Sequence, residues 1–317
     1  MRRSLVLTVF FVFLVAFVAQ AQEVLIRKKP DPSVPSFGVI LKRSVVYIEL
    51  QCKGGNLLIS RVVSIAGTGF LVAYTDPRLP KGTFFEYLVT NRHVAECWDQ
   101  DNHPRSVQSL IVRANAKDGS SRNLPAYPGA WHVPVDDSVD LAVMSVTLPD
   151  DLLANAISVD DFATKDFMSS NQIAEGSPII LSGYFYQFSG ERRFQSIVRQ
   201  GILSMVPDEP MKTTTGKPGT VYLGDVHIFG GNSGSPVMVA TDWIGVGGYH
   251  FLGVVSGYYY EDQDFNLEIA TTVKGTAHAN SGVAMIVPAD LLKALLDGPE
   301  LKGAREAYFS QAAGAAK

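Results

Sequence analysis

Three short segments of the chain each carry one side chain that nucleophilic catalysis by serine requires. Ser233 lies in the run Gly-Asn-Ser-Gly-Ser-Pro, His93 in Thr-Asn-Arg-His-Val-Ala, and Asp140 in Val-Asp-Leu-Ala-Val. A serine hydroxyl is a weak nucleophile at neutral pH, so an imidazole must accept its proton and a carboxylate must fix the tautomer of that imidazole. The segments therefore predict acyl transfer, with Ser233 as nucleophile, His93 as general base and Asp140 as its orienting partner.

Two of these assignments have simpler alternatives. His93 is alternatively a structural histidine at a strand end, and Asp140 a turn residue. Asp136 and Asp137 compete with Asp140, but they look solvated, whereas Asp140 directly precedes an apolar strand. Four other histidines have no neighbours that suggest catalysis, so we expect surface or packing roles and no metal site for them. They are His103, His132, His250 and His278.

Glycines precede Ser233, and they matter for the charge that develops during acyl transfer. The oxyanion of a tetrahedral intermediate must be met by backbone N–H groups, and bulky side chains at these positions would hinder that approach. We expect the N–H groups of Gly231 and Ser233 to be the donors, with Gly230 as a further unhindered position. The alternative for the two glycines is a plain turn.

The first 21 residues predict a secretory signal peptide. Arg2 and Arg3 form a positive start, an apolar run follows over 5–18, and Ala-Gln-Ala at 19–21 fits a cleavage site. An uncleaved membrane anchor is the alternative, but the run is shorter than the roughly 20 residues that a span needs. We expect a secreted or periplasmic protein without a membrane partner after cleavage.

Charge and composition narrow the choice of partners. The 317 residues are 46% hydrophobic and 18% charged, which suits a folded protein with a sizeable core. Loss of the signal peptide removes two arginines, so the formal net charge moves from −4 to −6. Nucleic-acid binding needs clustered cations, which we do not find. The expected partner is a protein or peptide substrate, with no cofactor and no metal; the sequence leaves the oligomeric state open.

Cys52 and Cys97 are the two cysteines of the chain. An oxidising compartment permits a disulfide between them, which would tie the segment that follows His93 to a preceding strand. Two buried free thiols are the alternative. Neither cysteine has the surroundings of a nucleophile.

Short β-rich runs separated by Gly, Pro, Asn and Asp predict an all-β protein. One series precedes a stretch at 149–176 that lacks a clear period, and another follows it, which indicates two barrels with a crossing linker that holds one short helix. The runs cover 44–50, 69–74, 84–90, 109–114 and 141–146, then 178–186, 195–205, 220–225, 236–240, 245–256 and 282–287.

Leucines at helical spacing after a proline predict a short closing helix at 289–296, stopped by Gly298 and Pro299. We therefore expect four parts: the signal peptide at 1–21, an N-terminal extension at 22–43, a catalytic domain at 44–298 and a flexible tail at 299–317. The domain divides near residue 165, with barrel one before it and barrel two from about 166.

The chain order His, Asp, Ser is that of the chymotrypsin fold, whereas subtilisins run Asp, His, Ser and α/β-hydrolases Ser, Asp, His. With this order, the sequence over 45–296 resembles the trypsin-like serine proteases of the chymotrypsin superfamily, nearest to the bacterial heat-shock trypsin-like and glutamyl endopeptidase types. The matching segments are Gly-Thr-Gly-Phe at 67–70, Leu-Val-Thr-Asn-Arg-His-Val at 88–94, Asp-Leu-Ala-Val at 140–143 and the run at 231–236.

The resemblance implies two antiparallel six-stranded β-barrels and a secreted serine endopeptidase with a triad of His93, Asp140 and Ser233. Ser235 stands where many members have glycine, but the glutamyl type shares this serine. Asn232 replaces the aspartate that pairs with a new N-terminus in digestive members, so we expect activity without zymogen cleavage. The heat-shock relatives carry PDZ modules that we do not find, so their assembly behaviour is not inherited.

For substrate binding, the resemblance places the base of the primary pocket at His227 and its walls at Ser256, Gly257 and Gly282. No aspartate stands at the base and no histidine at Val255, so we expect a small or apolar side chain at the cleavage position. His227 is alternatively structural. The three tyrosines at 258–260 form either a substrate rim or a packed strand end.

Two rival functions remain. A catalytically silent binding protein of the same fold is the first, because function resides in the site and not in the fold. A lipase or esterase is the second, but it needs a Gly-x-Ser-x-Gly turn, and here the last glycine is replaced by Ser235.

Overall fold

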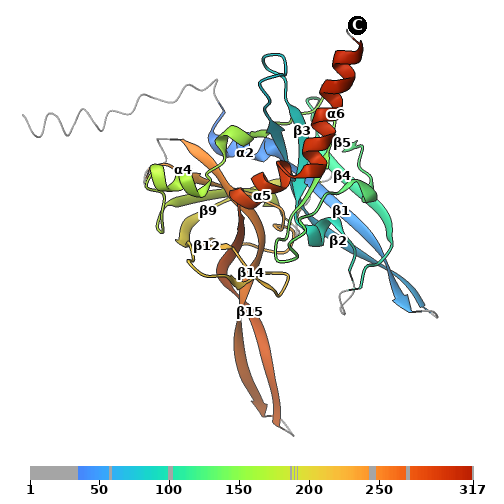
Figure 1. Ribbon diagram of the computed structural model, residues 1–317. Coiled ribbons are helices and arrows are strands. Elements are labelled where there is room, and N and C mark those ends of the chain that lie inside the picture. The colour runs from blue at the N-terminus through green and yellow to red at the C-terminus, as the bar shows by residue number, and fades with distance from the viewer. Residues whose placement is uncertain are drawn as a thin grey trace, which may run out of the picture. The chain divides into compact units, whose positions relative to one another are not determined.

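The computed structural model describes residues 35–56, 59–98, 103–185, 188, 190, 192–242, 248–268 and 272–315. The predicted signal peptide and most of the predicted N-terminal extension lie outside these residues. Antiparallel strands are the main regular elements of the described chain, with a few helices (Figure 1).

The first half of the chain forms a seven-stranded sheet. The strand order is β5-β4-β1-β2-β3-β6, and β7 pairs with β2 in parallel. The long strand β2 pairs with β1 up to Phe70, and from Phe70 onward it also pairs with β3. The strands are β1 (Val45–Asn56), β2 (Ile59–Tyr74), β3 (Phe85–Thr90), β4 (Val107–Asn115), β5 (Ser121–Leu124), β6 (Ala142–Ser145) and β7 (Ile157–Ser158).

The second half forms a closed barrel in the order β12-β15-β14-β13-β8-β9, completed by pairing of β9 with β12. Strands β14 and β15 continue past the barrel as a two-stranded ribbon (Figure 1). A separate small hairpin, β10 and β11, lies between β9 and β12. The strands are β8 (Pro178–Tyr184), β9 (Ser196–Met205), β10 (Met211–Lys212), β11 (Pro218–Gly219), β12 (Tyr222–Asp225), β13 (Pro236–Ala240), β14 (Tyr249–Glu268) and β15 (Thr272–Pro288).

The prediction of two six-stranded antiparallel barrels therefore holds for the second half and needs correction for the first. Among the described strands of the first half, pairing does not close the sheet, and β7 adds a parallel pair. The edge strand β6 meets His132 through one isolated bridge with Val143 instead of a further strand. The short 3-10 helix η1 (Pro128–Ala130) just before His132 brings that residue to the edge.

Helices are few. The predicted closing helix is confirmed as α5 (Ala289–Leu296), and the linker holds α4 (Lys165–Ser170) preceded by the 3-10 helix η2 (Val159–Asp161). The others are α2 (Phe37–Ser44), α3 (Arg92–Ala95) and α6 (Pro299–Ala315). No helix among the described residues is long and apolar enough to span a membrane.

The flexible tail predicted at 299–317 is corrected by helix α6, which packs on the first sheet. Its Arg305 is only 4% exposed, donates to the Tyr87 hydroxyl at 2.9 Å and lies over the Tyr74 ring. On the outside of the helix, Glu306 pairs with both terminal nitrogens of Arg78 at 2.8 Å. The tail is therefore held by polar and aromatic contacts.

Each half has its own hydrophobic core. One cluster of buried side chains draws only on residues from Val46 to Leu152, and a second draws only on residues from Ala163 to Ile286. Phe251 of β14 bridges the halves, because its ring lies 5.3 Å from Phe70 and 4.6 Å from Phe162. The functional side chains described next gather at this junction.

Candidate active site

Ser233 lies in a loop that is fixed from inside by Asn232. The Asn232 backbone N–H donates to the Phe229 carbonyl at 3.0 Å, which forms a turn, and Gly231 at its third position has φ of 93°. Such a turn favours glycine there. The buried Asn232 side chain donates to the Tyr184 carbonyl at 2.8 Å and accepts from the Phe229 N–H at 2.9 Å. Its amide is thus satisfied on both sides by uncharged partners.

The loop is fixed from outside by Thr68, which reaches it from the other half of the chain. The Thr68 N–H donates to the Ser233 carbonyl at 2.8 Å. Its hydroxyl donates to the Gly231 carbonyl at 2.7 Å and accepts from the Tyr184 N–H at 2.8 Å. Thr68 is fully buried, so these bonds are shielded from water. One threonine thereby joins the serine loop to the first sheet.

Gly234 has no room for a side chain. A Cβ atom there would lie 1.9 Å from the Thr68 carbonyl oxygen and 2.5 Å from the Thr90 hydroxyl, and its φ of 84° disfavours other residues. Its N–H donates to the Val255 carbonyl of β14 at 2.8 Å. The glycine after Ser233 is therefore required by packing at the junction.

His93 and Asp140 come together at one end of the paired strands β3 and β6. His93 lies on α3, just after β3, and its Nδ1 is 2.7 Å from Oδ2 of Asp140, just before β6. The His93 backbone N–H donates to Oδ1 of Asp140 at 3.2 Å, and the Asn91 side chain donates to the Asp140 carbonyl at 2.8 Å. The Thr214 hydroxyl donates to Oδ2 at 3.2 Å. The carboxylate thus accepts from a ring, a backbone group and a hydroxyl.

This contact shifts both pKa values in opposite directions. Burial opposes charge on Asp140, which is 2% exposed, but the His93 ring and the hydrogen bonds outweigh it and lower the pKa of Asp140. Desolvation likewise opposes the imidazolium, but the attraction and hydrogen bond of Asp140 raise the pKa of His93 above its ordinary value. The His93 side chain remains 44% exposed, so its other nitrogen can face solvent or a ligand.

A cleft of about 870 Å³ has all three predicted triad residues on its wall. Ser256 and Gly257, two of the four predicted substrate-binding residues, also line it. The other two, His227 and Gly282, lie near each other but are not among its lining residues. The tyrosines at 258–260 line it together with Met285, which gives the cleft an aromatic and apolar side.

The predicted oxyanion donors are available in the described part of the chain. The N–H groups of Gly231 and Ser233 have no acceptor among the described residues, whereas those of Asn232, Gly234 and Ser235 all do. Two unpaired N–H groups beside a partly exposed serine can receive an anionic oxygen.

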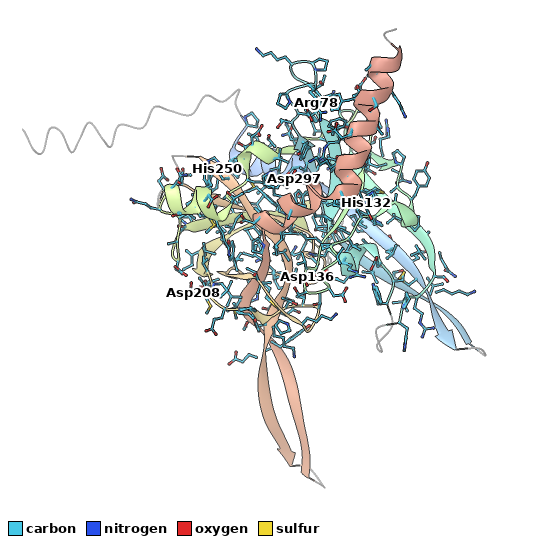
Figure 2. All side chains as sticks on the ribbon, in the orientation of Figure 1. Arg78, His132, Asp136, Asp208, His250 and Asp297 are labelled. Atoms are coloured by element: carbon cyan, nitrogen blue, oxygen red, sulfur yellow. A yellow bond between two sulfur atoms is a disulfide. The ribbon has the colours of Figure 1, made fainter. Side chains whose placement is uncertain are left out.

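The rivals of Asp140 are engaged elsewhere. Asp136 accepts from the Ser138 N–H at 2.9 Å and so caps its own turn. Figure 2 shows it well away from Arg78 and from helix α6. Asp137 forms exposed ion pairs with Arg92 at 3.1 Å and Lys217 at 2.6 Å. Neither carboxylate is hydrogen-bonded to the His93 ring in the described structure, so the geometry favours Asp140.

Two other histidines have structural contacts. His132 pairs with Glu300 of α6 at 2.6 Å. The His250 ring packs on Phe167 with centroids 4.3 Å apart. These positions fit the surface and packing roles expected from the sequence; the side chain of His278 lies outside the described part.

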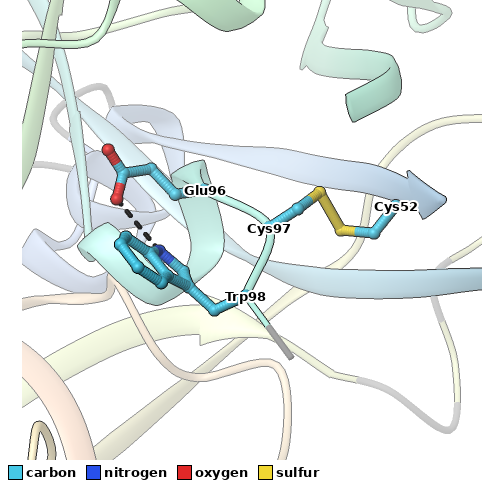
Figure 3. Close-up of a disulfide and its surroundings, with 4 residues drawn as sticks. All are labelled: Cys52, Glu96, Cys97 and Trp98. Atoms are coloured by element: carbon cyan, nitrogen blue, oxygen red, sulfur yellow. Dashed lines mark hydrogen bonds between the residues drawn. A yellow bond between two sulfur atoms is a disulfide. The ribbon is translucent and has the colours of Figure 1, made fainter. Parts of the chain in front are cut away.

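Cys52 and Cys97 form a disulfide that connects β1 to the segment after α3 (Figure 3). Both are buried beside Leu50. Next to them, the Trp98 indole donates to Glu96 at 3.0 Å, and Glu96 also pairs with Arg92. The segment that carries His93 is therefore anchored by Arg92 before this residue and by Glu96 and the disulfide after it.

Two residues at the site were missed by sequence reasoning. Thr68 lies inside a matching segment, and a buried hydroxyl between two glycines could have suggested a polar contact. Thr214 lies in a run of three threonines with no chemical signature, so its contact with Asp140 could not be foreseen.

Comparisons with known proteins identify similar solved structures and one family. Two solved structures are similar: that of Deg5 has a TM-score of 0.47 and 20% identity, over 80% of this chain and 87% of that chain. An inactive form of Rv3671c from M. tuberculosis H37Rv has a TM-score of 0.44 and 17% identity, over 85% and 95%. No curated protein matches the chain. The model of the trypsin-like peptidase domain matches residues 67–247, more than half of the chain, and the chain belongs to that family.

Proposed function

We propose that the protein is a secreted serine endopeptidase in which His93, Asp140 and Ser233 form the catalytic triad. The observation that carries the proposal is the 2.7 Å contact of His93 with a buried carboxylate in the cleft that Ser233 also lines. This contact holds the ring with a proton on Nδ1, which leaves Nε2 free to accept one.

The chemistry follows from these positions. His93 takes the Ser233 proton as the hydroxyl oxygen attacks the substrate carbonyl carbon, and the N–H groups of Gly231 and Ser233 stabilise the oxyanion. The C–N bond then breaks, and His93 returns the proton to the leaving amine. A water molecule, deprotonated by His93, then attacks the acyl-enzyme. The ester C–O bond breaks, His93 returns the proton to the Ser233 oxygen, and the acid product leaves.

A fluorophosphonate probe tests the nucleophile directly. The purified protein should be labelled at one site, located by mass spectrometry at Ser233, and Ser233→Ala should abolish both labelling and hydrolysis of an internal bond in a peptide library. Ser235→Ala is the matched control for labelling, because Ser235 is fully buried beside the loop. Labelling that persists in Ser233→Ala would contradict the proposal.

A silent binding protein of the same fold is the alternative. Its signature would be peptide binding without labelling at any serine. The paired His93 and Asp140 favour the enzyme, since a binding protein has no need for an oriented imidazole with a free nitrogen.

We further propose a preference for small or apolar side chains at the cleaved position. Met285 and Tyr258 line the cleft beside Gly257, which makes this part of the wall apolar and aromatic. Cleavage of the peptide library mainly after Arg, Lys or Glu would overturn this preference.

The contacts of Asn232 support activity without zymogen cleavage. Its side chain is satisfied by Tyr184 and Phe229, so the loop has no unpaired carboxylate that awaits an ammonium group. Protein with residues 1–21 removed should hydrolyse peptides without further processing. Activity that appears only after proteolytic nicking would overturn this expectation. Secretion or periplasmic export is proposed from the signal sequence alone.

A further inference from the structure

The small hairpin at 211–219 reaches from the barrel half to the segment that carries Asp140. It consists of β10, β11 and the turn between them, and three contacts dock it on residues 137–140. Thr214 donates to Asp140 at 3.2 Å, Lys217 pairs with Asp137 at 2.6 Å, and Gly219 packs so closely on Ser138 that a Cβ would lie 2.6 Å from its hydroxyl.

The turn of this hairpin is itself well ordered by hydrogen bonds. Thr213 donates to the Lys217 carbonyl at 2.9 Å and contacts the Thr215 hydroxyl at 2.9 Å. On the barrel side, the Tyr259 hydroxyl donates to the Lys212 carbonyl at 3.2 Å. Thr214 is therefore presented to Asp140 from a braced turn.

Ser256 also lines the cleft, but its hydroxyl does not donate to Asp140 in the described structure. The side chain of Ser256 is buried and its oxygen has no hydrogen-bond partner in the described structure. The hydroxyl that Asp140 receives comes from Thr214 instead. A hydrogen bond to a charged group is stronger than one between neutral groups, so this contact can influence how the carboxylate faces His93.

We propose that Thr214 is a positioning residue for catalysis, which holds Oδ2 of Asp140 toward His93. The 211–219 hairpin that carries Thr214 would thus be part of the catalytic assembly. The inference rests on the proposed triad and adds a fourth member to it from a different element. A Cβ added at Gly257 would lie 2.7 Å from the Thr214 methyl group, so Thr214 lies between the carboxylate and this wall of the cleft.

The charged groups around this assembly define the background of any pH measurement. Arg92 on α3, Asp137 before β6 and Lys217 on the hairpin line the cleft with His93 and Asp140, and Asp137 pairs with both cations. Lys212 of the hairpin also lines the cleft. His93 is the group to follow in a pH titration, because an imidazole ordinarily changes charge near neutral pH.

The test compares Thr214→Val, which keeps the shape but removes the hydroxyl, with Thr214→Ser, which keeps the hydroxyl. Thr214 is exposed, so both variants should fold. We expect Thr214→Val to lower kcat roughly 10- to 100-fold with little change in KM, the size of a lost hydrogen bond to a charged group. Thr214→Ser should retain the kcat of the unaltered protein.

An NMR titration of the His93 ring supplies a readout that needs no activity. The hydroxyl hydrogen of Thr214 partly neutralises the Asp140 carboxylate, so its loss in Thr214→Val should raise the pKa of His93, whereas Thr214→Ser should leave it in place. A pKa of His93 that stays unchanged or falls in Thr214→Val, or a Thr214→Ser protein that behaves like Thr214→Val, would overturn the inference. If no protein hydrolyses peptides but the pKa of His93 shifts as expected, the proposed function fails and the positioning role stands.

Discussion

The serine loop and the His93–Asp140 pair are held in place in different ways. The loop depends on hydrogen bonds to buried Thr68 and Asn232, and it has no room for a side chain at Gly234. The pair depends on side-chain groups, with a buried carboxylate that three donors reach and a ring that is 44% exposed. Adding one atom should therefore damage the loop, whereas removing one polar atom should damage the pair.

Asp140→Asn is the largest expected change, and it acts on the pair alone. An amide in place of the carboxylate can no longer hold the ring with its proton on Nδ1, so Nε2 would carry the proton and could not accept one from Ser233. We expect kcat to fall about 10⁴-fold, while the midpoint of denaturant unfolding changes little. Peptide hydrolysis and urea titration measure the two. A loss of kcat smaller than about 10-fold would show that Asp140 does not orient the base.

Gly234→Ala should damage the loop and the stability together. The new Cβ would overlap the Thr68 carbonyl and force a positive φ on alanine, which should lower the free energy of unfolding by about 3 kcal/mol. Fluorophosphonate labelling should be lost as well. Gly230→Ala is the matched control, because a Cβ there meets nothing within 4 Å and its stability should stay within about 0.5 kcal/mol. Equal stability of the two variants would refute the packing argument.

Removal of the disulfide tests how far the pair depends on its anchor. Cys52→Ala combined with Cys97→Ala opens a bond between residues 45 apart in sequence and should lower the free energy of unfolding by about 2–4 kcal/mol. At 25 °C we expect most activity to remain, since His93 still bonds Asp140. Loss of labelling at Ser233 in a folded double variant would mean that the disulfide positions the His93 ring directly.

A change of pH should move activity and stability in opposite directions, and we expect this effect to be the smallest of those predicted here. Catalysis needs neutral His93, so kcat/KM should fall roughly tenfold per pH unit below the raised pKa of this ring. The same shift favours the folded state below the ordinary value of 6.5, and that contribution disappears as pH rises through the raised folded pKa. Hydrolysis rates and thermal unfolding between pH 5 and 9 would detect the opposite trends. In Asp140→Asn both trends should shift to lower pH.

The sequence allowed the three residues of the proposed triad to be chosen, because each lies in a segment whose neighbours have a physical task. Gly234 illustrates this, since the motif demands glycine and the structure leaves no space for Cβ. The role of Thr214 could not be predicted, because a hairpin contact across 74 positions leaves no local pattern. The base of the pocket assigned to His227 was carried over from a resemblance, and that residue does not line the cleft.

At the level of the fold, strand patterning predicted the second barrel well and the closure of the first half poorly. Whether a sheet closes depends on which edges meet, and an isolated bridge such as that between His132 and Val143 has no sequence signature. Helix α6 was missed because its alanines and glycines give no apolar stripe. Its attachment instead uses the buried guanidinium of Arg305, which composition marks as a surface group.

The bond network of Thr68 has a consequence for when the chain becomes competent. The candidate nucleophile Ser233 belongs to one half and the candidate base His93 to the other, and buried Thr68 is one of several residues that join the two. A nascent or partly unfolded chain, in which the halves have separated, would possess every reactive group and yet be inert.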